Sequence, residues 1–235
     1  MESGSKNKII VILGPTSSGK SEVAIKLARK FNGEIISADS RQVYRGMDIG
    51  TGKVSRVQQK LAKHWILDIV NPKTEYNAAK FKKDAEKIIE NILKRKKLPI
   101  ICGGTGFWIK SIVDNFNFPE VKPDKKLRNK LEKYSAEKLF EILKKLDLER
   151  AKKIDAKNKV RLIRAIEICK AIGKVPKIIM HNDKYDFLQI GIDMPKEELH
   201  KKIKKRLEKR FEAGMIEEVK ELHGQKLSWK KIQSF

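Results

Sequence analysis

The segment 14–21 (GPTSSGKS) holds the residues whose types and spacing point most directly to chemistry. Its spacing matches the pattern G-x-x-x-x-G-K-[ST] of a phosphate-binding loop. The glycines let successive backbone N–H groups face one anion, and the helix expected to follow adds the positive end of its dipole. Lys20 supplies a mobile positive charge, and the Ser21 hydroxyl is placed to ligate Mg²⁺. The sequence therefore predicts a site for a diphosphate or triphosphate, formed by Gly14, Pro15, Thr16, Ser17, Ser18, Gly19, Lys20 and Ser21.

Asp39 and Thr105 each follow a predicted strand. In an open parallel sheet, ligands bind outside the carboxyl ends of the strands, so these two side chains should converge on the mouth occupied by the phosphate loop. Asp39 could bind Mg²⁺ through water or act as a general base. A helix cap or an ion pair is the structural alternative for Asp39.

Strands and amphipathic helices alternate through the first half of the chain. Short β-branched or apolar runs predict strands, and apolar residues at helical spacing predict helices. This alternation is typical of an α/β fold, here a P-loop NTPase-like parallel sheet flanked by helices. The expected strands are 8–13, 34–38, 98–102 and, as a further candidate, 65–70, and the expected helices are 22–31 and 77–93.

The pattern changes near Asn115. A linker with two prolines, 117–123, leads into a block that contains only helical patterns, after which a strand at 187–192 and a long helix at 196–213 follow. We therefore expect a catalytic core formed by 1–114 and 187–235 and an inserted all-helical subdomain at 115–186. Its expected helices are 125–134, 136–146, 148–154 and 159–172, with Ser135 as a cap and Gly173 as a terminator.

The chain of 235 residues carries 54 basic and 30 acidic side chains, a formal charge of +24. This charge favours polyanionic partners such as nucleic acid or an acidic membrane. However, 43 of the basic residues are lysines, and a lysine-rich surface can also reflect genome composition or thermal adaptation. No apolar run is long enough to span a bilayer, and residues 1–7 form a polar tail. Two cysteines suggest no disulfide scaffold and a reducing cytoplasm, and the cysteines and four histidines show no metal-ligand spacing.

Several blocks together resemble the tRNA dimethylallyltransferase family, also called tRNA isopentenyl transferases. The most specific is 36–52 (ISADSRQVYRGMDIGTG), and it joins the phosphate loop and 102–105 (CGGT). Segments 76–81, 159–167 and 199–219 fit the family's order and spacing. Family members usually continue beyond the I-x-S-x motif that 232–235 forms, so the resemblance implies that C-terminal helices are missing from this chain.

The resemblance implies transfer of a dimethylallyl group from its diphosphate to N6 of the adenosine on the 3′ side of a tRNA anticodon. Asp39 would accept the proton of the amine. Lys20, the loop amides, Mg²⁺ on Ser21 and Arg206 would match the charge of the leaving diphosphate, while Thr16 and Thr105 would orient it. A shift of one helical turn would give Arg210 the role of Arg206.

The resemblance also implies that the target adenine flips out of the anticodon stack. Ser40, Arg41 and Gln42 would then line the adenine side, and Gly106 would let the nucleic-acid backbone come close. Arg161 and Arg164 share one helix face and would touch the anticodon loop, with surface charge as the alternative reading. We expect a cytoplasmic, monomeric enzyme whose helical insertion grips tRNA.

Three other functions stay open at this point. A P-loop kinase for a small molecule or nucleoside would bind ATP at the phosphate loop and should be stabilised by ATP and Mg²⁺. An adenylate isopentenyltransferase should be inhibited by AMP and not by tRNA. A non-catalytic RNA-binding module should keep its cellular function after Asp39→Ala or Lys20→Ala.

Overall fold

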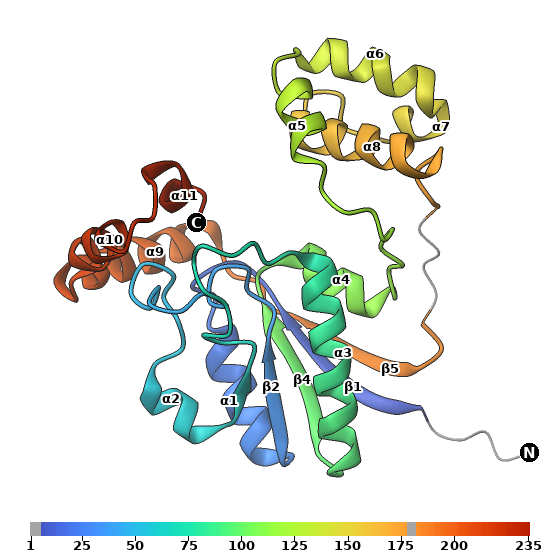
Figure 1. Cartoon of the computed structure of the whole chain (residues 1–235). Helices are drawn as coiled ribbons and strands as arrows, with labels where there is room; N and C mark the ends of the chain where they lie inside the picture. Colours follow the sequence, from blue (N-terminus) through green and yellow to red (C-terminus); the bar gives the residue numbers. More distant parts are fainter. Residues whose placement is uncertain (1–5, 178–181) are drawn as a thin grey trace, which may run out of the picture. The chain divides into compact units, whose positions relative to one another are not determined.

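The computed structural model of the chain describes residues 6–177 and 182–235. The chain divides into two compact units, one formed by 1–115 with 180–235 and the other by 116–179 (Figure 1). The first unit holds the sheet, and the second is helical. We describe each unit separately.

Five parallel strands form the sheet of the first unit, in the order β3-β2-β4-β1-β5. The predicted parallel sheet flanked by helices is therefore confirmed. The strands are β1 (Asn7–Leu13), β2 (Gly33–Ser37), β3 (His64–Trp65), β4 (Leu98–Gly103) and β5 (Tyr185–Gly191).

The expectation of a strand over 65–70 is wrong beyond its first residue. Ile66 and Asp68 adopt left-handed backbone conformations, with φ of 61° and 56°, which interrupt an extended strand. Only a single bridge from Val70 to Tyr44 continues the pairing.

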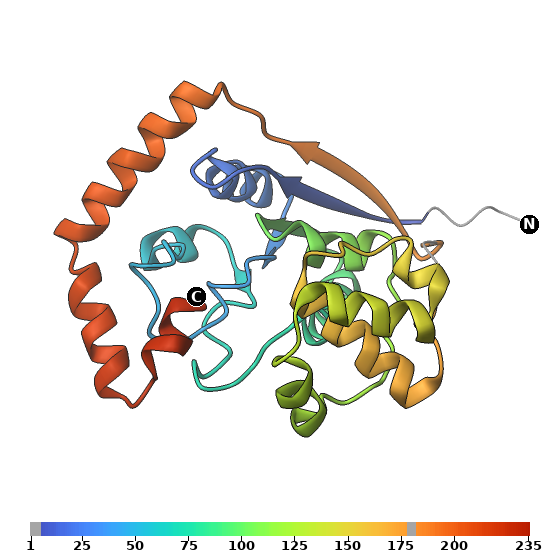
Figure 2. The ribbon, with the colours of Figure 1, turned by 90° about the horizontal axis from the view of Figure 1, so that it is seen from above.

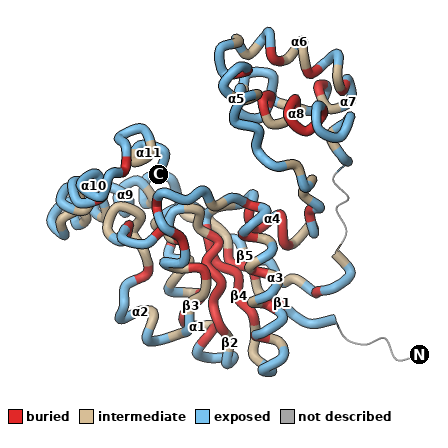
Figure 3. The backbone as a smooth tube through the Cα atoms, in the orientation of Figure 1, coloured by how far each residue is buried: buried red, intermediate tan, exposed pale blue. Residues whose placement is uncertain are grey.

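Helices cover both faces of the sheet. On one face α1 (Lys20–Lys30) packs Ala24, Ile25 and Ala28 against Ile12, Ile35 and Ile100 of three strands. Because side chains alternate along a strand, the neighbouring residues Ile36 and Ile101 face the opposite side. There α3 (Ala78–Lys94) and α4 (Gly106–Val113) pack together, and Phe81 stacks on Trp108 with ring centroids 4.6 Å apart. The central strands β2 and β4 are the most continuously buried part of this unit (Figure 3).

The order of the strands places a crevice beside β1. The connection from β1 through α1 reaches β2 by passing β4, whereas the connection from β4 reaches β5 by passing β1. The chain thus leaves two adjacent strands in opposite directions. Such a switch point, at the carboxyl ends of the strands, is where open α/β sheets bind ligands.

Four helices of the first unit lie outside those expected from the sequence: α2 (Arg56–Leu61), α4, α10 (Met215–Gly224) and α11 (Trp229–Gln233). The long helix α9 (Lys196–Glu212) was expected, and α10 follows it directly along one side of the unit (Figure 2). Helix α11 then turns back, so that the ring of Phe235 lies 4.6 Å from that of Tyr44. The C-terminal residues therefore lie beside the loop that follows β2.

A buried ion cluster ties the amino end of β2 to its neighbours. Glu34 is 1% exposed and accepts hydrogen bonds from Arg95 at 2.5 and 2.7 Å, from Lys97 at 2.9 Å and from the Trp65 indole at 2.8 Å. The hydrogen bonds from Arg95 outweigh the effect of burial and lower the pKa of Glu34 to about 2. Glu34 is therefore charged throughout the physiological range.

The second unit contains α5 (Lys125–Leu131), α6 (Ala136–Leu146), α7 (Leu148–Ala151) and α8 (Lys159–Ile172). Leu139, Leu143, Leu162 and Ile166 are fully buried at its centre. The Ser135 hydroxyl caps α6 and Gly173 ends α8, as expected. Helices α5 and α7 end three residues earlier than expected, at Leu131 and Ala151.

The expected insertion, 115–186, extends too far at its C-terminal side. The strand β5 already begins at Tyr185, which is buried and pairs with Asn7 of β1. The residues from 180 onward accordingly group with the sheet, and the helical unit ends at 179.

Within the described parts of the chain, no helix combines the length and the apolar character needed to cross a membrane. Cys102 and Cys169 are both buried and free. His181 and the first five residues of the polar tail lie outside the described residues.

Candidate active site

The phosphate loop connects β1 to α1 at the switch point. Ser17 and Gly19 adopt left-handed conformations, with φ of 66° and 90°, so the chain curls before the helix begins. Gly19 precedes α1 without a side-chain cap, which leaves the helix N-terminus to an external acceptor. The Lys20 ammonium group donates to the Pro15 carbonyl at 2.5 Å and so lies against the loop.

A cavity of about 1010 Å³ opens at the carboxyl ends of the strands. The phosphate loop contributes Thr16, Ser17, Gly19, Lys20 and Ser21 to its lining. Other lining residues come from the ends of β2 and β4, from the loop 47–54 and from helices α9 and α10. Gly14, Pro15 and Ser18 are not in the lining, and Ser18 is buried beneath the loop.

Asp39 and Thr105 both line this cavity, at the ends of adjacent strands. The Asp39 carboxylate accepts hydrogen bonds from the backbone N–H groups of Arg41 at 2.9 Å and Gln42 at 3.3 Å, which fix its direction. The Thr105 hydroxyl accepts from the Ser40 N–H at 3.0 Å. The bond between Ser40 and Thr105 joins the ends of the two strands.

Gly103 permits the ends of β2 and β4 to lie close together. A Cβ atom at Gly103 would lie 2.1 Å from the Ala38 carbonyl oxygen, so a larger residue would push the ends of β2 and β4 apart. The spacing of Asp39 and Thr105, which follow these two strands, therefore depends on the glycine at position 103.

Arg206 and Arg210 reach the cavity from successive turns of α9. Arg206 donates to the Gly52 carbonyl at 2.8 Å and to the Ser17 hydroxyl of the phosphate loop at 3.4 Å. The Arg210 side chain lies beside the same glycine. The sequence left a choice between the two arginines, and the structure places both at the site with Arg206 in contact with the phosphate loop. Lys202 and Lys209 of α9 also line the cavity.

Burial makes the charged forms of these basic side chains less stable. Desolvation lowers the pKa of Lys20, and the attraction of the Asp39 carboxylate opposes this effect. Desolvation likewise lowers the pKa of Arg206 and of Arg210, and Arg210 is further lowered by its neighbour Arg206. Burial raises the pKa of the Cys102 thiol to about 12, so Cys102 is neutral and adds no counter-charge. The cavity thus holds several cations whose charges an entering anion would stabilise.

Glu218 of α10 was given no role by the sequence. Its carboxylate accepts three backbone hydrogen bonds from the loop after β2, from Asp48 and Ile49 at 2.7 Å each and from Gly50 at 2.9 Å. The acidic pair at 217–218 was visible only as part of the pattern that located Arg206. The hydrogen-bond partners of Glu218 are backbone groups, which cannot be recognised from the sequence.

Four residues expected to face RNA belong to the sheet unit. Ser40, Arg41 and Gln42 line the cavity next to Asp39. Arg41 also donates to the Ser234 carbonyl at 2.5 Å, and the Gln42 amide donates to Gly52 at 3.4 Å. Gly106 is the first residue of α4 and is not in the cavity lining, and a Cβ there would meet no atom within 4 Å.

Arg161 and Arg164 lie on α8 of the helical unit and differ in their surroundings. Arg161 is exposed. Arg164 forms an ion pair with Glu167 and donates to the Val121 carbonyl at 2.9 Å. Burial alone would raise the pKa of Glu167, but hydrogen bonds from Arg128 and Arg164 lower it to about 2. Arg164 therefore serves an internal ion cluster, which was not expected from the sequence.

The chemistry of the lining fits Mg²⁺ bound together with a diphosphate. Mg²⁺ usually keeps several waters and takes only one or two protein ligands beside the phosphates. The Ser21 hydroxyl and the Asp39 carboxylate both face the cavity. No group of three or more histidine, cysteine and acidic side chains placed to hold a metal ion occurs in the described ranges.

Comparison with known proteins identifies a family that this chain resembles. The family model for IPP transferase matches residues 42–234. A tRNA dimethylallyltransferase of Leuconostoc mesenteroides is 43% identical over 212 residues, which cover 90% of this chain and 71% of that protein. The structure of a tRNA isopentenylpyrophosphate transferase from Staphylococcus epidermidis has a TM-score of 0.64 at 42% identity and covers 94% of this chain and 74% of that one.

A eukaryotic dimethylallyltransferase acting on tRNA gives a TM-score of 0.80 at 31% identity, over 93% of this chain and 56% of that chain. The matched segments include the loop after β2, the strand β4 and the arginine-bearing helix α9. On these grounds, the chain belongs to the IPP transferase family.

Proposed function

We propose that this chain transfers the dimethylallyl group of dimethylallyl diphosphate to N6 of the adenosine on the 3′ side of a tRNA anticodon. The observation that carries the proposal is a single cavity lined by a phosphate loop, by two arginines and by the Asp39 carboxylate. Relatives named as tRNA dimethylallyltransferases support the choice of reaction.

The reaction is a substitution at the allylic carbon. The bond between this carbon and the bridging oxygen breaks, and the electron pair leaves with diphosphate. A bond forms between the carbon and N6 of adenine, and N6 gives up one proton to Asp39. The two backbone N–H groups that hold Asp39 leave its second oxygen available for this proton.

The leaving diphosphate gains negative charge in the transition state. Lys20 and Arg206 are already in place around the phosphate loop, so they can stabilise that charge without rearrangement. Ser21 and the diphosphate oxygens would together hold Mg²⁺, which when bound supplies further positive charge to the leaving group. Thr16 and Thr105, which both line the cavity, would orient the diphosphate.

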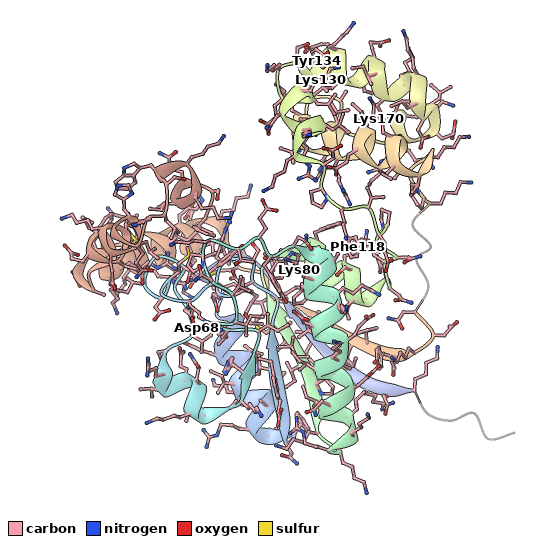
Figure 4. All side chains as sticks on the ribbon, in the orientation of Figure 1. Asp68, Lys80, Phe118, Lys130, Tyr134 and Lys170 are labelled. Carbon is pink, nitrogen blue, oxygen red and sulfur yellow. The ribbon has the colours of Figure 1, made fainter. Side chains whose placement is uncertain are left out.

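A tRNA partner matches the positive charge of the chain. The helical unit, residues 116–179, carries 19 basic and 9 acidic side chains. Exposed lysines such as Lys130 and Lys170 lie on its helices (Figure 4). Such a surface attracts phosphates without reading sequence. We assign this unit to tRNA binding and the sheet unit to chemistry, in an enzyme that acts as a monomer in the cytoplasm.

The test is incubation of the chain with labelled dimethylallyl diphosphate and unmodified tRNA, followed by mass analysis of the nucleosides. Label should enter N6 of one adenosine, and a tRNA with guanosine at that position should stay unlabelled. Labelling of AMP with no labelling of tRNA would identify an adenylate isopentenyltransferase instead. Stabilisation by ATP and Mg²⁺, with none by dimethylallyl diphosphate, would identify a kinase.

A further inference from the structure

Glu218 occupies a position that links the C-terminal helices to the phosphate site. We propose that Glu218 is a positioning residue: its carboxylate fixes the loop 48–52, and through Gly52 this loop sets the place of Arg206 at the phosphate loop. The inference rests on the proposed function, because it concerns the binding of the prenyl diphosphate. Glu218 itself acts on the substrate only through other groups.

The first link is the carboxylate and the loop. Both Glu218 oxygens are used, one by the N–H groups of Asp48 and Ile49 and the other by that of Gly50. Three converging donors require an acceptor with two oxygens. A glutamine would place an NH₂ group against at least one backbone N–H, so donor would face donor. The charge and the shape of the carboxylate are both needed.

The second link is the stiffness of the loop. The Gly52 N–H donates to the Ile49 carbonyl at 2.9 Å, and the Lys53 N–H donates to the Asp48 carbonyl at 2.9 Å. The Lys53 ammonium group further bonds to the Tyr44 carbonyl at 2.8 Å and forms ion pairs with Asp48 and Asp68. Anchoring residues 48–50 therefore also fixes the position of Gly52.

The third link joins the loop to the phosphate site. The Gly52 carbonyl accepts from Arg206 at 2.8 Å and from the Gln42 amide at 3.4 Å. The other end of the Arg206 guanidinium group donates to the Ser17 hydroxyl at 3.4 Å. A displaced Gly52 would release Arg206 from its position. Long side chains lose much of their binding energy when they must be ordered during binding.

The chain offers a matched pair of variants, Glu218→Gln and Glu217→Gln. Both remove one negative charge from the first turn of α10, but Glu217 is exposed. Glu218→Gln should weaken binding of inorganic diphosphate by about tenfold or more and speed amide exchange of residues 48–50. The KM for dimethylallyl diphosphate should rise, while the KM for tRNA should stay at the wild-type value. Glu217→Gln should match the wild-type chain in all four measurements.

A double-mutant cycle with Arg206→Ala separates positioning from general stability. If Glu218 acts through Arg206, Glu218→Gln should cause little further loss of diphosphate affinity when Arg206 is absent. A full additional loss in that background, or wild-type affinity of Glu218→Gln alone, would overturn the inference.

The wild-type chain provides a test in case Glu218→Gln does not fold. Coupling between two sites is reciprocal, so saturating diphosphate should slow amide exchange of residues 48–50. Unchanged exchange would refute the link. A wild-type chain that binds diphosphate but transfers no prenyl group would refute the proposed function, and the exchange experiment would still decide the role of Glu218.

Discussion

Gly52 offers the sharpest test of how the arginines are placed. Its φ of +59° lies in the left-handed region, and a Cβ atom would lie 2.0 Å from Arg210 Nη2 and 2.1 Å from Arg206 Nη2. These atoms are the ends of flexible side chains, so Gly52→Ala should displace both arginines and leave the fold intact. The left-handed conformation itself should cost about 1–2 kcal/mol of folding free energy.

The expected loss of diphosphate affinity is larger than the folding cost of the left-handed conformation suggests. Displacing Arg206 breaks its bond to the Gly52 carbonyl and weakens its hold on Ser17. Hydrogen bonds with a charged partner contribute about 1.5–3 kcal/mol. Diphosphate affinity should therefore fall by about 10- to 150-fold, because about 1.4 kcal/mol corresponds to a factor of ten.

Gly46→Ala is the matched control. Gly46 has a similar φ of +69°, but a Cβ there would meet no atom within 4 Å. Both variants should lose the stability that the left-handed conformation costs, and Gly52→Ala should also lose the bond between Arg206 and the Gly52 carbonyl. Only Gly52→Ala should lose affinity for diphosphate in calorimetric titration with Mg²⁺. Equal affinities for the two variants would show that Gly52 does not position the arginines, and the reasoning would fail.

Four further outcomes are expected. Asp39→Asn keeps the side-chain shape but removes the base. Single-turnover transfer should therefore slow by about 100-fold or more, while diphosphate still binds. A loss of diphosphate binding would show instead that Asp39 is a metal ligand. Lys20→Ala should weaken diphosphate binding in the same titration. Wild-type affinity of this variant would show that Lys20 does not bind the leaving diphosphate. Arg161→Ala should lower tRNA affinity and reduce the slope of log affinity against log salt by about one, and an unchanged slope would show that Arg161 does not contact RNA phosphates. Glu34 has a pKa of about 2 when folded, against 4.5 as its ordinary value, so it stabilises the fold above pH 4.5 and this contribution is lost as the pH falls towards 2. The free energy of unfolding of wild type relative to Glu34→Gln should fall by roughly 3 kcal/mol over that range, and a constant difference would contradict the assignment.

The elements that the sequence predicted well are those with one clearly buried face. Helix α3 buries Phe81, Ala85, Ile89 and Ile92, residues spaced three or four apart, and its limits differ by one residue from those expected. Helix α4 was missed because GFWIKSIV has apolar residues around most of its circumference, a pattern that does not distinguish a buried helix from a strand. The expected strand at 65–70 fails at the left-handed residues Ile66 and Asp68. Aspartate is one of the residues enriched in this region, but a β-branched residue such as Ile66 gives no such signal.

The residues of the site also divide into those that the sequence predicted and those that it did not. The phosphate loop was found because all its contacts are local, and Arg206 because a sequence pattern lies next to it. Glu218 was missed because its partners are backbone amides 168–170 residues away. Arg164 could have been read as a structural residue, since Glu167 follows it at a spacing of three on the same helix.

The parallel pairing of β1 with both β4 and β5 also determines the order in which the chain can fold during synthesis. Strands β1 to β4 leave the ribosome first, so β1 is for a time an edge strand with the apolar sequence IIVIL and unpaired backbone groups. The helical unit is made next, and its local contacts favour rapid folding. Only then does β5 arrive to cover β1. A substitution that slows the helical unit would lengthen this exposure and promote aggregation of the nascent chain, although it touches no residue of the sheet.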